Sequence, residues 1–164
     1  MRDKFKSCTL LRITSDRVRL ICEGLLGMVQ IDASTVTKDS VVPLQGIYIW
    51  RFKADGRPAY IGVGLGKKGL QQRIVEQHLR ASYNKSVFRK AIEKEACIGP
   101  SQESVRFIRS HFTLAVIPCP EDSPAIVDAA EALLIAAINP RYNKTKDNNR
   151  QYIKPDRAKN PSGI

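Results

Sequence analysis

Two apolar, β-rich runs stand near the middle of the chain, at residues 45–52 and 58–63. Residues 54–57, which lie between them, read Ala-Asp-Gly-Arg, and an Asp-Gly step between two such runs is a strong β-hairpin signal. We therefore predict two antiparallel strands, which would place Tyr48 and Tyr60 on neighbouring strands where side chains can meet across the ladder. Because β propensity alone also favours tyrosine in strands, the pair needs support from elsewhere in the chain.

The hydrophobic pattern downstream predicts further elements. Apolar residues at helical spacing indicate a helix over residues 70–81 and a basic amphipathic helix over residues 86–96. Residues 111–118 alternate and predict a third strand. A last helix, with a proline in its first turn, is expected over residues 124–138. The expected fold class is α/β of the α+β kind: a small, mainly antiparallel sheet of three or more strands flanked by helices.

The first 45 residues show β character. Residues 8–13 and 18–22 are apolar runs around a Ser-Asp turn, which predicts a hairpin, and residues 25–31 are a further candidate strand. Such an extension could enlarge the sheet, form a dimer surface or contact DNA. The expected organisation has three parts: a β-rich extension at 1–45, a core domain at 46–143 and a basic, flexible tail at 144–164.

Charge points to a polyanionic partner. The chain has 27 Lys and Arg against 16 Asp and Glu, a formal charge of +11, and a pI near 9.8. A cluster of basic residues follows the second strand, which favours nucleic-acid binding over an ordinary solvated helical face. The side chains that we expect to contact the DNA backbone are Lys67, Lys68, Arg80, Lys85, Arg89, Lys90 and Arg141.

The sequence indicates neither a membrane protein nor a zinc-binding protein. The longest apolar stretch, residues 125–138, is too short to span a bilayer, and the first residues lack the apolar core of a signal peptide. The four cysteines form no Cys-x-x-Cys pair, and only two histidines could complete a zinc site. We expect a cytoplasmic protein with reduced, packed thiols.

A glycine-rich loop at residues 62–69 separates the second strand from the next helix. Three of its glycines spell G-x-G-x-x-G, which can mark dinucleotide binding. Because Lys67 and Lys68 interrupt the motif and no successive βαβ units follow, we favour contact with a phosphate backbone instead.

A carboxylate stands in the middle of the last predicted helix. Glu131 lies among alanine and aliphatic residues, with Asp128 one turn earlier. A buried carboxylate needs a partner, and a hard divalent cation, Mg²⁺ (or Mn²⁺), would supply one. The alternative is a glutamate on the exposed side of a surface helix.

Five short motifs together resemble the GIY-YIG nuclease superfamily, over roughly residues 46–143. Gly-Ile-Tyr ends at Tyr48, Tyr-Ile-Gly begins at Tyr60, and Leu-x-x-Arg ends at Arg73. Glu131 follows on the last helix, and Pro-Arg-Tyr-Asn ends at Asn143. This closing motif looks like that of members related to the excision-repair incision nuclease.

The resemblance implies a metal-dependent phosphodiesterase. Tyr48 and Tyr60 would lie near the attacking water, with Tyr48 as general base, and Arg73 would stabilise charge on the phosphate. Glu131 would bind one Mg²⁺, and Asn143 would orient its neighbours by hydrogen bonds. Because a free tyrosine has a pKa of about 10, Arg73 and the cation would have to lower it, so cleavage should rise with pH.

The sequence departs from the family pattern at two positions. Many members carry a histidine four residues after the arginine, whereas here that position is Gln77 and His78 comes one later. A regular helix would turn His78 away from Arg73, so we expect a packed histidine first and a catalytic one second. Relatives often place a lysine directly after the second tripeptide, where this chain has Val63, and Lys67 or Lys68 would substitute.

The favoured function is a DNA endonuclease of the restriction or defence type, acting on double-stranded DNA, with a homodimer as one arrangement that would cut both strands. Its base contacts would come from residues 1–45 or 83–110. Two alternatives remain open at this point. One is a repair or recombination nuclease that acts on structured DNA, and the other is a non-catalytic DNA-binding module.

Overall fold

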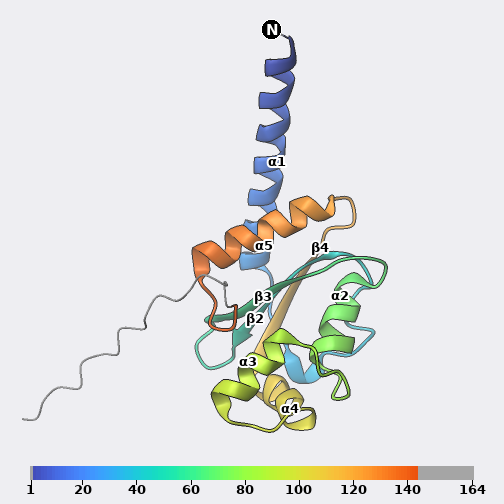
Figure 1. Cartoon of the computed structure of the whole chain (residues 1–164), viewed down its shortest axis with the longest axis vertical. Helices are drawn as coiled ribbons and strands as arrows, with labels where there is room; N and C mark the ends of the chain where they lie inside the picture. The colour runs from blue at the N-terminus through green and yellow to red at the C-terminus, as the bar shows by residue number, and fades with distance from the viewer. Residues whose placement is uncertain (1, 144–164) are drawn as a thin grey trace, which may run out of the picture.

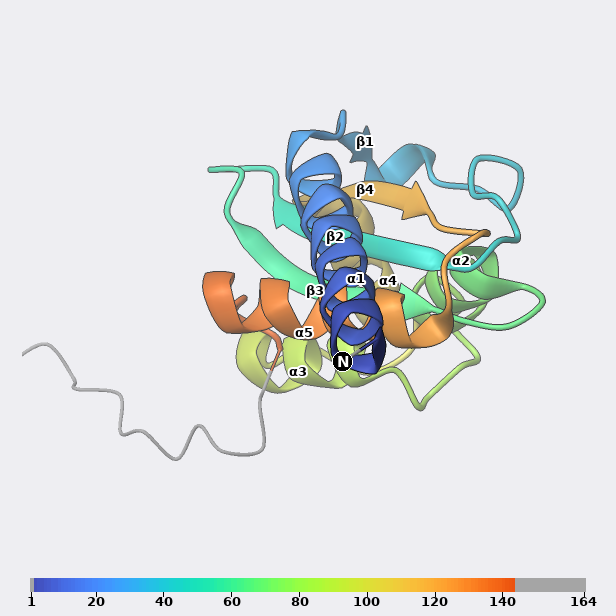
Figure 2. The same ribbon diagram turned by 90° about the horizontal axis from the view of Figure 1, so that it is seen from above.

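The computed structural model describes residues 2–143, and the predicted basic tail at 144–164 lies outside the described residues. A four-stranded antiparallel sheet forms its centre, in the order β1-β4-β2-β3 (Figure 2). The α+β class and the flanking helices predicted from the sequence are confirmed. The strands are β1 Ile31–Asp32, β2 Gly46–Phe52, β3 Pro58–Gly64 and β4 Phe112–Pro118.

Helices cover both faces of the sheet, so the molecule has three layers (Figure 1). One face carries the long helix α1 (Arg2–Gly27) and α5 (Pro124–Ile138), which pack against each other and against the strands. The other face carries the remaining helices, which are α2 Gly69–Gln71, the π-helix η2 Gln72–His78, α3 Val87–Ala96 and α4 Gln102–His111, while the short 3₁₀-helix η1 Ala33–Thr35 contacts α4 and β4.

Alternation along β2 produces two separate cores. Ile47 and Ile49 pack with the buried aliphatic side chains of α1 and α5. Tyr48 and Trp50 point to the opposite face, where they join an aromatic core with Phe88 of α3. Since side chains on a strand alternate between its two faces, a continuous apolar run such as this one fits a central strand that is covered on both sides.

The predicted N-terminal hairpin is wrong, because residues 2–27 form the single helix α1. Val18, Ile21 and Leu25 recur at three- and four-residue spacing and face the core between α5 and the sheet. Arg17 adds a paired contact through Nε at 2.7 Å and Nη2 at 2.8 Å from the carboxylate of Asp122. The tertiary surface thus favours a helix where local β propensity favoured strands. The first half of α1 extends away from the body (Figure 1).

Other boundaries differ less. The predicted strand at residues 25–31 is wrong, because residues 25–27 end α1 and only Ile31 belongs to the two-residue β1. The strand over residues 111–118 and the helix over residues 124–138 are confirmed by β4 and α5. Helix α4 was not predicted, although its amphipathic residues follow directly on a Pro-Ser step.

Candidate functional site

The two tyrosines of the paired tripeptides meet on the aromatic face of the sheet. Tyr48 pairs with Gly62 in the ladder, and Tyr60 pairs with Trp50, so the two rings lie diagonally with centroids 6.3 Å apart. A Cβ atom at Gly62 would overlap the hydroxyl of Tyr48. Glycine is therefore required opposite Tyr48. The glycine that ends the second tripeptide leaves the space that the tyrosine of the first tripeptide occupies.

Close packing also fixes the helix that follows β3. A Cβ at Gly64 would overlap the backbone of Gly69 and the N–H of Leu70. The backbone of β3 therefore touches the start of α2, while Leu70 itself is fully buried. The glycine-rich loop thus acts in packing, and it holds η2 against the end of the sheet where the tyrosines lie.

A π-helix places Arg73 and His78 on the same side of η2. The N–H of Leu79 donates to the carbonyl of Ile74 over 3.0 Å, five residues back instead of four. In such a wider turn, residues five apart lie on one face, and π-helical turns are frequently found at functional sites. The assumption of a regular helix is therefore wrong, and His78 is not turned away from Arg73, whereas the expectation of a packed histidine is confirmed by its burial.

His78 lies at the centre of the aromatic face and contacts the first tyrosine. Its Nε2 lies 2.6 Å from the hydroxyl of Tyr48, and its Nδ1 lies 2.8 Å from Oγ of Ser86. The side chain is only 1% exposed. Burial, followed by the positive charges of Arg73 and Arg89, lowers the pKa of His78 to about 3. The imidazole is thus neutral at ordinary pH and bonded at both nitrogens.

Arg73 lies at the border between this buried group and an open pocket. Its Nη1 donates to Oε1 of Gln77 over 2.7 Å, while its buried Nε has no hydrogen-bond partner among the described residues. Burial acts to lower the pKa of Arg73, but Tyr48 and Tyr60 raise it above its ordinary value. The pocket has a volume of about 260 Å³ and is lined by Val63, Gly64, Leu65, Gly69, Gln72, Arg73 and Gln77.

The hydroxyl of Tyr48 is held in its protonated form. Tyr48 has no exposed surface, and burial, with Tyr60 as the next cause, raises its pKa well above the ordinary value. Arg73 acts in the opposite direction, as expected from the sequence, but it does not overcome burial. For Tyr60, burial likewise raises the pKa and Arg73 opposes it. Neither phenol ionises near neutral pH from the protein charges alone.

Glu131 approaches the same group from α5. Its side chain is half-buried, and burial and then Asp128 raise its pKa, while Arg73 and the backbone of Val63 lower it. No cluster of three or more His, Cys, Asp or Glu that could hold a metal occurs among the described residues. A single half-buried carboxylate is a ligand that Mg²⁺ can use, because this ion keeps several waters, and binding of Mg²⁺ at Glu131 stays a prediction.

Asn143 is a positioning residue for β3. Its Oδ1 accepts from the N–H of Ile61 over 2.7 Å, and its Nδ2 donates to the carbonyl of Ile61 over 2.8 Å. Next to it, the N–H of Tyr142 donates to the carbonyl of Ala59 over 2.8 Å. The closing motif thus clamps the outer edge of the strand that carries Tyr60.

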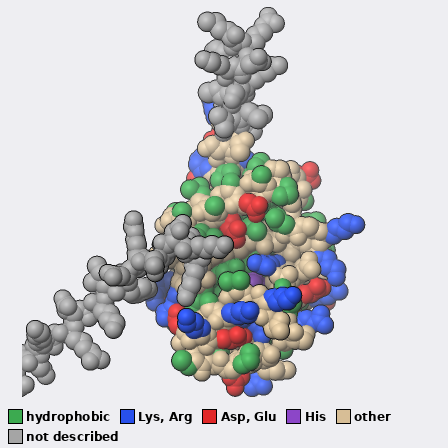
Figure 3. Space-filling view, in the orientation of Figure 1, with side chains coloured by type: hydrophobic (Ala, Val, Ile, Leu, Met, Phe, Trp, Pro, Cys, Tyr) green, Lys and Arg blue, Asp and Glu red, His purple; other side chains and the backbone are tan. Residues whose placement is uncertain are grey.

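The seven residues predicted to contact DNA differ in how exposed they are and in which contacts they already make. Lys67, Lys68, Arg80, Lys85 and Lys90 are exposed on the loops and helices around η2 and α3. Figure 3 shows Lys and Arg side chains gathering below α5 on that face of the molecule. Lys68 has a partner, Glu76, at 3.4 Å. These positions suit a polyanion, and DNA contact stays a prediction.

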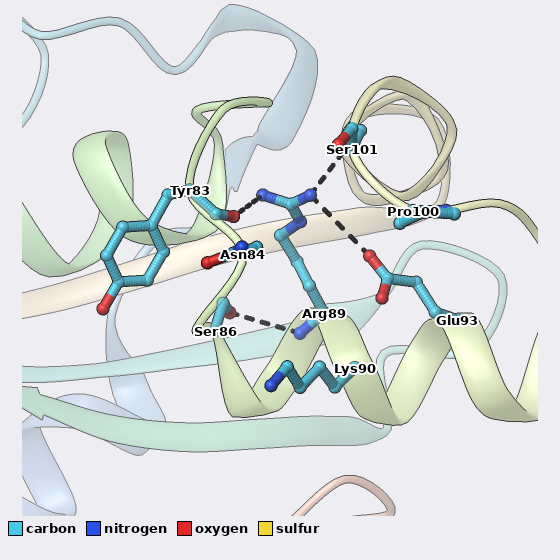
Figure 4. Close-up of a pocket in the computed structure, with 8 residues that line it drawn as sticks. All are labelled: Tyr83, Asn84, Ser86, Arg89, Lys90, Glu93, Pro100 and Ser101. Carbon is cyan, nitrogen blue, oxygen red and sulfur yellow. Dashed lines mark hydrogen bonds and ion pairs between the residues drawn. The ribbon is translucent and has the colours of Figure 1, made fainter.

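Arg89 corrects that prediction, because it is 2% exposed and supports the fold (Figure 4). Its Nη1 donates to the carbonyls of Arg80 and Tyr83 at 2.8 and 2.6 Å, and its Nε donates to Ser104 at 2.9 Å. Its Nη2 reaches the carbonyl of Ser101 at 3.2 Å and Glu93 at 3.7 Å. A guanidinium with five donors suits such a junction of α3, α4 and the loop before them.

Arg141 is exposed, and its guanidinium contacts nearby residues of the protein. It pairs with Glu95 at 2.5 Å and lies 6.0 Å from the ring centroid of Phe52. Those contacts stand beside the β2–β3 hairpin, where Phe52 and Arg141 line a separate, shallow pocket. Its predicted contact with DNA is neither supported nor contradicted by this position.

Ser86 was missed from the sequence as a site residue. It caps the N-terminus of α3 and contacts His78, although the two are eight residues apart. The only sequence signal was a serine at the expected start of a helix, which is typical of an N-cap and carries no indication of a catalytic neighbour.

The remaining findings concern the class of protein to which the chain could belong. Among residues 2–143, no helix combines the length and the apolar content that crossing a bilayer requires. The thiols of Cys22, Cys97 and Cys119 are free, and the first and last of them are buried. Comparison of the chain with protein-family models, with curated proteins and with solved structures found no match.

Proposed function

We propose that this protein is a metal-dependent endonuclease that hydrolyses phosphodiester bonds in DNA. One observation carries the proposal: Tyr48 and Tyr60 lie on one face of the sheet with ring centroids 6.3 Å apart, and Arg73 of η2 and Glu131 of α5 lie close enough to affect the pKa of both. A set of one arginine, two phenols and a half-buried carboxylate is what hydrolysis of a phosphodiester needs, and packing alone gives no reason to gather it. The residues are Tyr48, Tyr60, Arg73 and Glu131.

Arg73 is proposed to bind the scissile phosphate. It lines the open pocket, and its buried Nε has a donor without a partner among the described residues. A guanidinium presents its N–H groups in a fixed fork that matches phosphate oxygens, so the charge that builds up on phosphorus can be stabilised without rearrangement.

Glu131 is proposed to hold the divalent cation. Burial and then Asp128 raise the pKa of Glu131, and Arg73 opposes them without overcoming them, so a bound cation would stabilise the ionised carboxylate. When bound, Mg²⁺ would neutralise charge on the phosphate and assist departure of the 3′ oxygen. Glu131, together with the exposed Asp128 one turn earlier, is the part of the chain that would attract it.

Tyr48 is proposed as the group that, once ionised to its phenolate, takes the proton from the attacking water and becomes a neutral phenol again. Since burial holds its pKa high, activity should increase as pH rises toward the alkaline range. Tyr48 has no exposed surface, so the water would have to reach its hydroxyl from the Arg73 side. The exposed lysines and Arg80 would hold the backbone of the duplex across this end of the sheet.

The biological setting is part of the proposal. We place the enzyme in the cytoplasm and assign it to restriction or defence, with a homodimer as the form that cuts both strands. Free, buried thiols at Cys22 and Cys119 agree with a reducing compartment.

The test is a cleavage assay on long, mixed-sequence duplex DNA with Mg²⁺, at neutral and alkaline pH. Wild type should give discrete fragments, and Glu131→Gln should give none while binding DNA with unchanged affinity. Glu121→Gln, an exposed carboxylate just before α5, is the matched control and should cut like wild type. A branched substrate in parallel separates the repair alternative. Binding without cutting of either substrate by wild type would leave a non-catalytic module and reject the proposal.

A further inference from the structure

Ser86 connects the start of α3 to the histidine of the site. As the N-cap of α3, its Oγ accepts the backbone N–H of Arg89 at 3.2 Å. The same Oγ lies 2.8 Å from Nδ1 of His78, and the residue is 3% exposed. Ser86 therefore makes two different hydrogen bonds in a place shielded from water, and the direction of the second one determines the protonation of the imidazole.

The direction follows from counting protons. A serine hydroxyl has one proton to donate and two lone pairs. The backbone N–H of Arg89 can only donate, so it occupies a lone pair of Oγ. Within the described residues, the remaining neighbour of Oγ is His78 Nδ1, the only one that can accept the hydroxyl proton. A buried hydroxyl left without an acceptor loses the hydrogen bond that water supplies in the unfolded chain, so the proton should point to Nδ1.

We propose that Ser86 fixes His78 in the tautomer that carries its proton on Nε2, so that His78 donates a hydrogen bond to the hydroxyl oxygen of Tyr48. The Nε2 to Oη distance of 2.6 Å is a short contact for such a donor. In this arrangement His78 does not take the proton of Tyr48, which points instead to the hydroxyl of Tyr60 within hydrogen-bonding reach. At alkaline pH hydroxide takes this proton and becomes water, and His78 and Arg73 stabilise the phenolate that remains.

Ser86 and His78 are thus positioning residues. The tautomer is a property of the folded protein and does not depend on activity. Its effect on catalysis rests on the proposed nuclease function.

The chain contains its own reference for the measurement. Its other histidine, His111, is exposed and has Nδ1 at 2.9 Å from Oγ of Ser110 and at 3.0 Å from the carbonyl of Phe107. Oγ of Ser110 donates its own proton to the carbonyl of Arg106 at 2.8 Å, so both neighbours of Nδ1 act as acceptors and Nδ1 of His111 carries the proton. The two histidines of this protein should therefore show opposite tautomers, and His111→Gln assigns the signals.

The experiment is long-range ¹H–¹⁵N NMR of the imidazole rings in the full chain, at mildly alkaline pH. In wild type, Nδ1 of His78 should have the shift of an unprotonated acceptor and Nε2 that of a protonated nitrogen. Ser86→Thr keeps both the cap and the hydroxyl donor and should preserve this pattern. Ser86→Asp keeps the cap but offers only acceptor oxygens, so Nδ1 should become protonated.

Two results would overturn the inference: a protonated Nδ1 with a bare Nε2 in wild type, or an unchanged tautomer in a folded Ser86→Asp variant. Circular dichroism establishes the folding of each variant. If the spectra are as expected and wild type cuts no DNA, the tautomer stands and the nuclease proposal fails. If wild type cuts DNA but Nδ1 is protonated, the nuclease proposal stands and this inference fails.

Discussion

The two faces of the sheet are built from one set of strands yet differ in kind. Toward α1 and α5, Ile47, Ile49 and Ile61 meet only aliphatic side chains and thiols. Toward η2, α3 and α4, the alternate positions of the same strands carry Tyr48, Trp50 and Tyr60, and buried hydrogen-bonding groups lie among them. The buried cluster on the first face contains only aliphatic side chains and thiols, whereas the second face buries a histidine, an arginine and two phenols. Glu131 lies on α5 but joins the second group beside Val63 of β3.

The comparison shows how a small domain can separate stability from function. An aliphatic core tolerates no polar group without a partner, and it gains stability in proportion to the area that it buries. The aromatic face can hold polar groups because rings such as Trp50 and Phe88 surround His78 without competing for its nitrogens. Variants on the two faces should therefore fail in different ways.

The largest difference in effect is expected between a substitution of Tyr48, which should affect cleavage, and one of its neighbour in sequence, Ile49, which should affect stability. Tyr48→Phe removes only a hydroxyl, so the fold should survive, whereas the proposed general-base step should slow by about 10²–10⁴-fold. Cleavage rates under single-turnover conditions, measured as a function of pH, test this, since the alkaline rise should vanish too.

Ile49→Ala supplies the other half of that contrast. It should lower the free energy of unfolding by about 2–5 kcal/mol through the cavity it leaves on the aliphatic face. The protein that remains folded should cut DNA at the wild-type rate. Urea denaturation gives the stability, and a loss of cleavage beyond the loss of folded protein would break the separation of the two faces.

The second prediction concerns two neighbouring cations on α3. Arg89→Leu leaves several buried acceptors without donors and should lower the free energy of unfolding by about 3 kcal/mol. Lys90→Ala, at an exposed position, should change it by less than about 0.5 kcal/mol. Salt-dependent DNA binding should respond in the reverse order, with Lys90→Ala the weaker binder. Equal stability of the two variants would contradict the buried role of Arg89.

The third prediction is an acid instability that originates on the aromatic face. The folded-state pKa of His78 is lowered to about 3, so the unfolded chain binds a proton below about pH 6.5 while the folded chain does not. This contribution to stability is complete above pH 6.5 and is lost progressively as pH falls toward 3. At pH 5 the loss should be about 2 kcal/mol.

Urea denaturation at pH 7 and pH 5 measures this loss. The variant His78→Gln should lose most of the pH dependence, whereas His111→Gln, at an exposed position, should keep it. If His78→Gln is as sensitive to acid as wild type, other groups cause the effect.

The smallest effect is expected at the edge of β3. Asn143→Ala removes two hydrogen bonds to Ile61 and should lower the free energy of unfolding by about 1–2 kcal/mol. Because Asn143 does not touch the tyrosines in the structure, activity should fall less than in Tyr48→Phe. Hydrogen exchange at Ile61 would detect the loosened edge, and unchanged protection would show that the clamp is dispensable.

The sequence predicted those features that depend on local order. The Asp-Gly turn and the apolar, β-rich runs on either side of it predicted the β2–β3 hairpin, and Pro124 predicted the start of α5. The approach of Tyr48 to Tyr60 followed from the hairpin alone. The same hairpin explains the glycine of the second tripeptide, because Gly62 lies opposite Tyr48.

What could not be predicted depends on packing between distant segments. α1 is helical because its stripe fits α5 and the sheet, which no local signal reports. Arg89 looks like its neighbour Lys90 until the position of α4 is known. The π-turn of η2 depends on where Arg73, Ile74 and His78 find partners, so spacing measured on a regular helix misplaced His78 by one residue.

The edge of β3 has a further consequence for self-association. An exposed edge strand normally invites another chain to add a strand to the sheet. Here the outward-facing carbonyl of Ala59 and both backbone groups of Ile61 are taken by the closing motif, and the backbone of Val63 faces Glu131. Two copies of the chain therefore cannot join into one continuous sheet through β3 without giving up the clamp, so any dimer that cuts DNA must form through other surfaces, with each candidate site kept whole inside its own subunit.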